Sequence, residues 1–204
     1  MNKCFLPLLF LVMAVLIAGG YFLRPSMPPA GVARFRFPGR GDAGVTAAPY
    51  SGNLDLPLTV SYSGPRTIFE WHTQTWVQGK ANPVTCRSLE NLADARQQAK
   101  FSLQDRLSEG KSYYSVSYGF RRTSMLGGTA SGSGSFSESI PNKASPWIAT
   151  LAPPGTVDLS EGAGVALWGI VGHRERLSLP PGASLEEWAS KADWAILVWV
   201  RLDR

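Results

Sequence analysis

The sequence predicts a mainly β fold, an antiparallel β-sandwich of about six to seven strands with one or two short helices, preceded by a single N-terminal transmembrane helix. Three observations support this prediction. Apolar and polar residues alternate over most segments after residue 50, which is the period of a half-buried strand. Glycine and proline are frequent, at 21 and 15 of 204 residues, as expected for a chain with many turns. An apolar run without a charged residue stands near the N-terminus.

The apolar run extends from Cys4 to Leu23 and is bracketed by Lys3 and Arg24. As a helix it would be about 30 Å long, which matches the hydrocarbon core of a bilayer. A cleaved signal peptide is the alternative, because the small residues at 18–20 resemble a cleavage site. The run continues beyond that site, however. We therefore expect residues 1–24 to be an uncleaved membrane anchor.

The charges beside the anchor leave its orientation open. Arg24, Arg34 and Arg36 follow the run, and this excess of positive charge mildly favours a cytoplasmic domain. A short N-terminal tail before a long domain is instead the usual layout of an exported, signal-anchored protein. We expect a single-pass protein whose domain is extracytoplasmic, in the periplasm or at the cell surface. A cleaved and secreted domain is the runner-up.

Residues 25–49 are rich in glycine, proline and arginine, and we expect them to be a linker. Within them, Arg34-Phe35-Arg36-Phe37 alternates in a way that suits a short strand or contact with lipid. The chain carries a net charge of +5, but residues 50–204 hold 15 Lys and Arg against 14 Asp and Glu and are therefore only +1. Because a nucleic-acid reader carries its positive charge on the folded surface, nucleic acid is not an expected partner.

Residues 50–204 are expected to form one globular β domain. Apolar residues alternate from Leu54 to Tyr62, and Pro57 within this segment predicts an edge strand because proline cannot donate to a ladder. Alternation also marks residues 67–76 as a strand. Further along, two alternating segments flank a turn at 108–111, and together they predict a β-hairpin whose strands cover Ala99 to Leu107 and Tyr113 to Phe120.

Two short helices are predicted by their N-terminal signals. One would run from Ser88 to Arg96 with Ser88 as its N-cap. The other would run to Lys191, because Ser184 and Glu187 form a capping box. The Gly/Ser-rich residues 127–139 are expected to be a flexible loop or hairpin tip.

The last strands are the most apolar. Val165 to Val171 predicts a buried strand, and Trp194 to Leu202 predicts a central C-terminal strand. Opposing apolar faces should pack together in a sandwich. We expect one such contact between the face of Tyr114, Val116, Tyr118 and Phe120 and the face of Ile196, Val198 and Val200.

Candidate site residues are few, because complete catalytic motifs are missing. A thiol nucleophile needs a nearby histidine, which makes Cys86 with His72 or His173, and a carboxylate such as Glu70, the candidate catalytic set. The alternative is that Cys86 is simply a packed apolar residue. Most of the seven tryptophans are expected in the core, whereas exposed rings would bind carbohydrate or peptide. Trp76 and Tyr113 are the surface candidates.

We therefore expect a membrane-anchored, extracytoplasmic domain that acts as a binding or scaffolding module for an unidentified ligand, with no catalytic activity, metal or cofactor. Its expected partners are the membrane and a protein. An envelope-associated hydrolase with a spatially assembled site is one alternative, and it requires the histidines, the cysteine and carboxylates to meet in one cleft. A structural subunit of a membrane complex is the other alternative, and it requires an exposed apolar patch.

Overall fold

The computed structural model describes residues 27–38, 45–50, 53–65, 67–84, 86–92, 95–108, 111–124, 129–139 and 145–203, of which 53–55 and 86–139 are described by their backbone. The predicted anchor lies outside the described residues. Within the described part, no helix is long and apolar enough to cross a bilayer.

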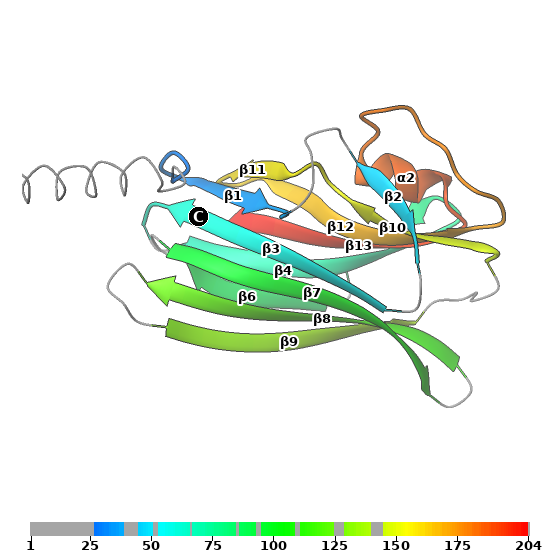
Figure 1. The fold of residues 1–204 in the computed structure, drawn as a ribbon, viewed down its shortest axis with the longest axis horizontal. Helices are drawn as coiled ribbons and strands as arrows, with labels where there is room; N and C mark the ends of the chain where they lie inside the picture. Colours follow the sequence, from blue (N-terminus) through cyan, green and yellow to red (C-terminus); the bar gives the residue numbers. More distant parts are fainter. Residues whose placement is uncertain are drawn as a thin grey trace, which may run out of the picture.

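The described chain is mainly β, with two antiparallel sheets and one helix (Figure 1). The first sheet has the order β11-β1-β3-β7-β8-β9. Its strands are β11 (Thr156–Ser160), β1 (Val32–Arg36), β3 (Asn53–Ser63), β7 (Ala95–Ser108), β8 (Lys111–Ser124) and β9 (Thr129–Ser139).

The second sheet has the order β2-β10-β12-β13-β4-β5, and β6 pairs with the same strand as β5, namely β4. Its strands are β2 (Thr46–Pro49), β10 (Trp147–Ala152), β12 (Gly164–His173), β13 (Trp194–Asp203), β4 (Thr67–Val77), β5 (Lys80–Ala81) and β6 (Cys86–Leu92). The helix is α2 (Leu185–Lys191). The described residues form more strands than the six or seven expected from the sequence. Short strands such as β2 and β5 were missed because they are too short to show an alternation of apolar and polar residues.

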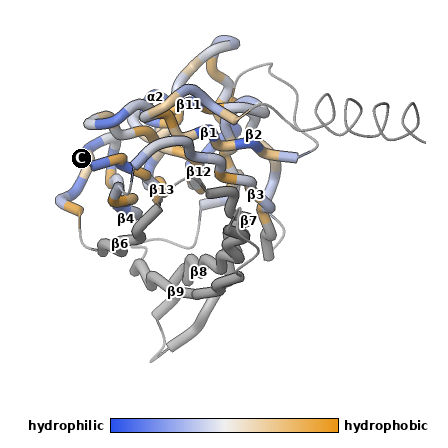
Figure 2. Tube along the Cα trace, turned by 90° about the vertical axis from the view of Figure 1, so that its left-hand side faces the viewer, coloured by the Kyte–Doolittle hydropathy of each residue, from blue (hydrophilic) through white to orange (hydrophobic). Residues whose placement is uncertain are grey.

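The main apolar core contains buried residues from both sheets. Buried and less buried residues alternate along β1 and most of β4, which turns one face of each strand toward this core, and Figure 2 colours their apolar residues orange. Aromatic rings join the sheets. Phe35 of β1 meets Phe69 and Trp71 of β4 edge-on, with both pairs of ring centroids 6.1 Å apart. Such pairs contribute about 0.5 to 1.5 kcal/mol each beyond the area they bury.

The range expected to be a linker therefore supplies part of this core. The alternation at 34–37 forms β1, and the side chains of Phe35 and Phe37 are almost wholly buried. On the opposite face of β1, Arg34 donates two hydrogen bonds of 2.8 Å to the carboxylate of Asp158 on β11. The hydrogen bond lowers the pKa of Asp158 and raises that of Arg34.

The strand that contains Pro57 is not an edge strand, as the sequence had suggested. β3 lies between β1 and β7. However, β1 pairs only with residues 59–63 of β3, so at Pro57 the strand has β7 as its sole neighbour among the described strands. The proline stands beyond the end of the β1 ladder, and there its missing N–H costs that ladder no bond.

Two further predictions are wrong. Ser88 to Arg96 is not a helix, because residues 86–92 form β6 and pair with β4, and β7 begins at Ala95. A serine N-cap signal is local and weak, and the ladder offered by β4 outweighs it. Likewise, residues 129–139 are not a loop but the strand β9, which pairs with β8 along its whole length. A neighbouring strand can hold a Gly/Ser segment whose own propensity is low.

Several predictions are confirmed. β7 and β8 form the expected hairpin, with Ser108 opposite Lys111. β13 is central, because it lies between β12 and β4. Helix α2 begins with the expected capping box, in which Glu187 N–H donates to Ser184 Oγ and Ser184 N–H donates to the Glu187 carboxylate. The packing of the Tyr114 face against β13 stays a prediction, since its side chains lie outside the described part.

Candidate functional site

An aromatic strip lies on the outer face of β4 and β13, the face turned away from the main core. We define the aromatic strip as His72 and Trp76 of β4 and Trp199 of β13. The register explains why they share a face: His72 is opposite Trp199, and Trp76 is opposite Ala195. In an antiparallel pair, opposite residues share a face, and every second residue along a strand returns to it.

The rings of His72 and Trp199 are stacked. Their centroids lie 6.0 Å apart and their planes differ by 6°. Both side chains, like Trp76, are only half-buried, so they are partly open to solvent. Glu70 is opposite Arg201 at the next outward-facing pair, which places a carboxylate and a guanidinium on the same face as the stacked rings.

Two donors in the strip have no partner among the described residues. The indole nitrogens of Trp76 and Trp199 are both inaccessible to solvent and make no hydrogen bond. A buried donor without an acceptor costs about 1 to 3 kcal/mol, so most such donors in proteins are satisfied. The strip therefore combines partly open rings with two N–H groups that are shielded from solvent.

Helix α2 covers the sheet next to the strip. Trp188 of α2 belongs to a second apolar cluster on this outer face, against which Trp76 and Trp199 pack. The turn between β4 and β5 approaches the end of α2 so closely that a Cβ at Gly79 would collide with the carbonyl oxygen of Ser190. The strip thus lies beside a helix whose C-terminal end is in contact with the β4–β5 turn.

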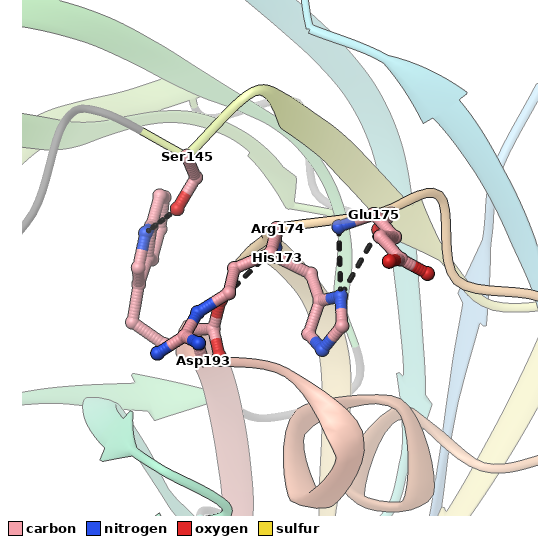
Figure 3. A network of polar contacts seen from close by, with 6 residues as sticks. Ser145, His173, Arg174, Glu175 and Asp193 are labelled. Atoms are coloured by element: carbon pink, nitrogen blue, oxygen red, sulfur yellow. Dashed lines mark hydrogen bonds and ion pairs between the residues drawn. The ribbon is translucent and has the colours of Figure 1, made fainter.

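A second polar group lies where the end of β12, the start of β10 and the α2–β13 junction meet (Figure 3). Trp194 Nε1 donates to Ser145 Oγ over 2.9 Å. Arg174 N–H donates to the Asp193 carboxylate over 3.0 Å. His173 Nδ1 lies 3.1 Å from the backbone nitrogen of Glu175 and 3.0 Å from its carbonyl oxygen. The ring tautomer decides whether Nδ1 accepts from this backbone or donates to it.

These residues include a serine, a histidine and an aspartate, but their bonds are not those of a catalytic triad. A triad needs the aspartate to bind histidine Nδ1 and the serine to reach Nε2. Here Nδ1 of His173 is taken by the backbone of Glu175, and the Asp193 carboxylate faces Arg174. Ser145 Oγ accepts from Trp194 instead. The group ties three chain segments together.

The other sequence candidates do not assemble. Cys86 lies opposite Thr73 of β4 in the register. Thr73 is buried on the inner face, whereas His72, its neighbour in the chain, is on the outer face. His173 is at the other end of the sheet, because its strand neighbour Gly172 is level with Trp194 while His72 is level with Trp199. Since His173 is one residue further, its gap to His72 is about 20 Å along the strands and two strands across. The side chains of Cys86 and Tyr113 lie outside the described part.

The sequence reading found His72 and Trp76 but missed Trp199 and Arg201. Trp199 and Arg201 lie on the apolar C-terminal strand, which we expected to be central in its sheet and therefore buried on both faces. Only the pairing of β13 with β4 reveals that this end of the strand is open on its outer side. Among the described residues, no three His, Cys, Asp or Glu side chains gather closely enough to hold a metal ion.

Comparison with known proteins adds no relative. No protein-family model, curated protein or solved structure matches the chain.

Proposed function

We propose that the chain is a membrane-anchored binding or scaffolding module with its β domain outside the cytoplasm, and that the aromatic strip is its contact surface. The stacked pair of His72 and Trp199 carries this proposal. Tryptophan and arginine are the side chains that most often dominate binding energy at protein interfaces. The strip offers two tryptophans, with Arg201 beside them.

The solvent-accessible parts of the strip and of Arg201 set the chemistry of the partner. The half-buried rings offer apolar area, and the exposed guanidinium of Arg201 beside them is a donor for carboxylate or carbonyl oxygens. The proposal therefore favours a protein or peptide partner that presents hydrogen-bond acceptors alongside apolar area.

Site-specific photo-crosslinking in native membranes tests the contact surface. The full chain would carry benzoylphenylalanine at Gln74, which is half-buried on β4 and faces outward between His72 and Trp76. The matched control carries it at Pro57, which is exposed on the first sheet. We expect a discrete adduct at 74 that Arg201→Glu weakens, and none at 57. Equal labelling at both positions, or no adduct at either, would contradict the strip as the contact surface.

The membrane topology needs a separate test. A single cysteine at the exposed position of Arg176 would be treated with an impermeant maleimide in intact cells, in a chain whose Cys4 and Cys86 are replaced by serine. Export predicts labelling of intact cells at the level seen after lysis. Labelling only after lysis would place the domain in the cytoplasm, whatever the cross-linking shows. Carbonate extraction of the same membranes distinguishes the uncleaved anchor from a released domain.

A further inference from the structure

The long strand β9 ends the first sheet with an open edge. It pairs with β8 from Thr129 to Ser139, and no described strand lies on its other side. In Figure 1, β9 runs below β8 along the lower edge of the first sheet. Because N–H and C=O groups alternate between the two sides of a strand, about half of its backbone groups face this edge.

The other sheet edges among the described strands are short or interrupted. β11 has 5 residues and carries Asp158 in its ion pair, and β2 has 4 residues and ends at Pro49. β5 has 2 residues and β6 has 7, and they share the edge of β4. Short strands, charges and prolines are the usual means by which proteins prevent edge-to-edge pairing.

β9 has none of these protections over most of its length. It has 11 residues, with no proline, lysine or arginine, and its only charge is Glu138 next to its end. Its register with β8 runs without a bulge. Its glycines make it costly to order, so pairing on one side alone supports it weakly. A second strand on the open edge would supply about ten more backbone hydrogen bonds.

The sequence of β9 suits pairing with itself. Two copies of β9 that are related by a two-fold axis pair antiparallel. When the axis passes through the middle residue, Gly134, this residue lies opposite its own copy. All 11 residues then pair, and Thr or Ser meets Ser at every odd-numbered position, a combination that stabilises antiparallel sheets. At even-numbered positions, Phe136 falls opposite Gly132 of the second copy, and an aromatic residue across from glycine compensates for the missing side chain.

We propose that the open edge of β9 binds β9 of a second copy of this chain, antiparallel and centred on Gly134, so that the first sheets of two copies become one continuous sheet. This pairing is independent of the aromatic strip, which lies on the second sheet. A dimer would present two strips, and a bivalent module binds a repeated partner far more tightly than a single one.

Disulfide cross-linking of the full chain tests the register. In a parent with Cys4→Ser and Cys86→Ser, Gly134→Cys would face its own copy at a Cα separation of about 4.5 to 5.5 Å, which a disulfide spans. The matched control Gly132→Cys would be about 13 Å from its copy. Upon mild oxidation in membranes, we expect at least tenfold more covalent dimer from Gly134→Cys. Gly132→Cys mixed with Phe136→Cys should also cross-link.

Lysines supply a second measurement that does not depend on disulfide chemistry. Ser133→Lys with Ser135→Lys places like charges opposite one another, and we expect the detergent-solubilised chain to sediment as a monomer while the exposed control Ala48→Lys stays dimeric. Circular dichroism confirms that each variant is folded. Monomeric parent chain, equal cross-linking at 132 and 134, or cross-linking at 134 to a different protein would each overturn the proposal.

Discussion

A methyl group added at Gly172 should be among the most damaging small changes in the domain. Gly172 is buried on β12 opposite Trp194, and a Cβ there would lie closer than 3.0 Å to three atoms of the indole ring, two of which belong to its five-membered half. To reach ordinary contact, the ring must retreat by roughly 1.3 Å. That movement would break the 2.9 Å hydrogen bond from Trp194 to Ser145.

The two effects add. Overpacking a dense core costs about 1 to 3 kcal/mol, and a lost hydrogen bond costs about 0.5 to 1.5 kcal/mol. We therefore expect Gly172→Ala to lower the free energy of unfolding by about 2 to 4 kcal/mol, which for a domain of this size lowers Tm by roughly 4 to 16 °C. Thermal melts followed by near-ultraviolet circular dichroism would measure the change in Tm and in tryptophan packing together.

The same strand offers a matched control. A Cβ at Gly164 would meet nothing closer than the Val200 carbonyl oxygen at 3.6 Å, so Gly164→Ala should be neutral or stabilise the domain by up to about 1 kcal/mol. In a Trp194→Leu background, Gly172→Ala should cost less than about 1 kcal/mol, because the ring is gone. If Gly172→Ala melts at the same temperature as Gly164→Ala, the close approach of glycine and indole is not real.

Three further predictions concern the edges and the centre of the sheets. The pKa of Asp158 is lowered beside Arg34, so the contribution of this ion pair to stability is present at neutral pH and is lost as pH falls below about 4. Asp158→Asn should therefore lower the free energy of unfolding by less than about 1 kcal/mol at pH 7 and flatten the decline of Tm between about pH 5 and pH 2. Gly79→Ala should destabilise more than Gly182→Ala in chemical denaturation, because both have positive φ but only Gly79 also meets a carbonyl oxygen. Deleting residues 194–204 removes the strand between β12 and β4, and calorimetry should then show no cooperative unfolding transition.

Local signals predicted the elements whose cause is local. The capping box of α2 is closed by residues three apart, and the β7–β8 hairpin combines two alternating segments with a tight turn. Both were readable because each needs no information from elsewhere in the chain. The candidate residues on β4 could be placed on one face for the same reason, since parity along a strand is a property of the segment itself.

Elements whose cause is a neighbouring strand could not be predicted in this way. Residues 129–139 have no apolar alternation, and β8 supplies the ladder that makes them a strand. The short strand β6 has a helix-like start, but β4 pairs with it. The stacked pair of the aromatic strip joins His72 and Trp199 through the β4–β13 register, which no spacing within either segment reveals.

The position of β1 changes the reach of the chain. If residues 25–49 were all linker, the domain could stand about 85 Å from its anchor. Because Val32 already pairs with Ser160 and Ser63 on two neighbouring strands, the proposed anchor at residues 1–24 would leave only residues 25–31 to span the distance, which is about 24 Å at full extension. If the proposed anchor is present, such a short tether would keep the domain within roughly one domain diameter of the lipid surface. It would meet partners that share its membrane, and a pulling force on the tether would load the β1 ladders on both sides in shear.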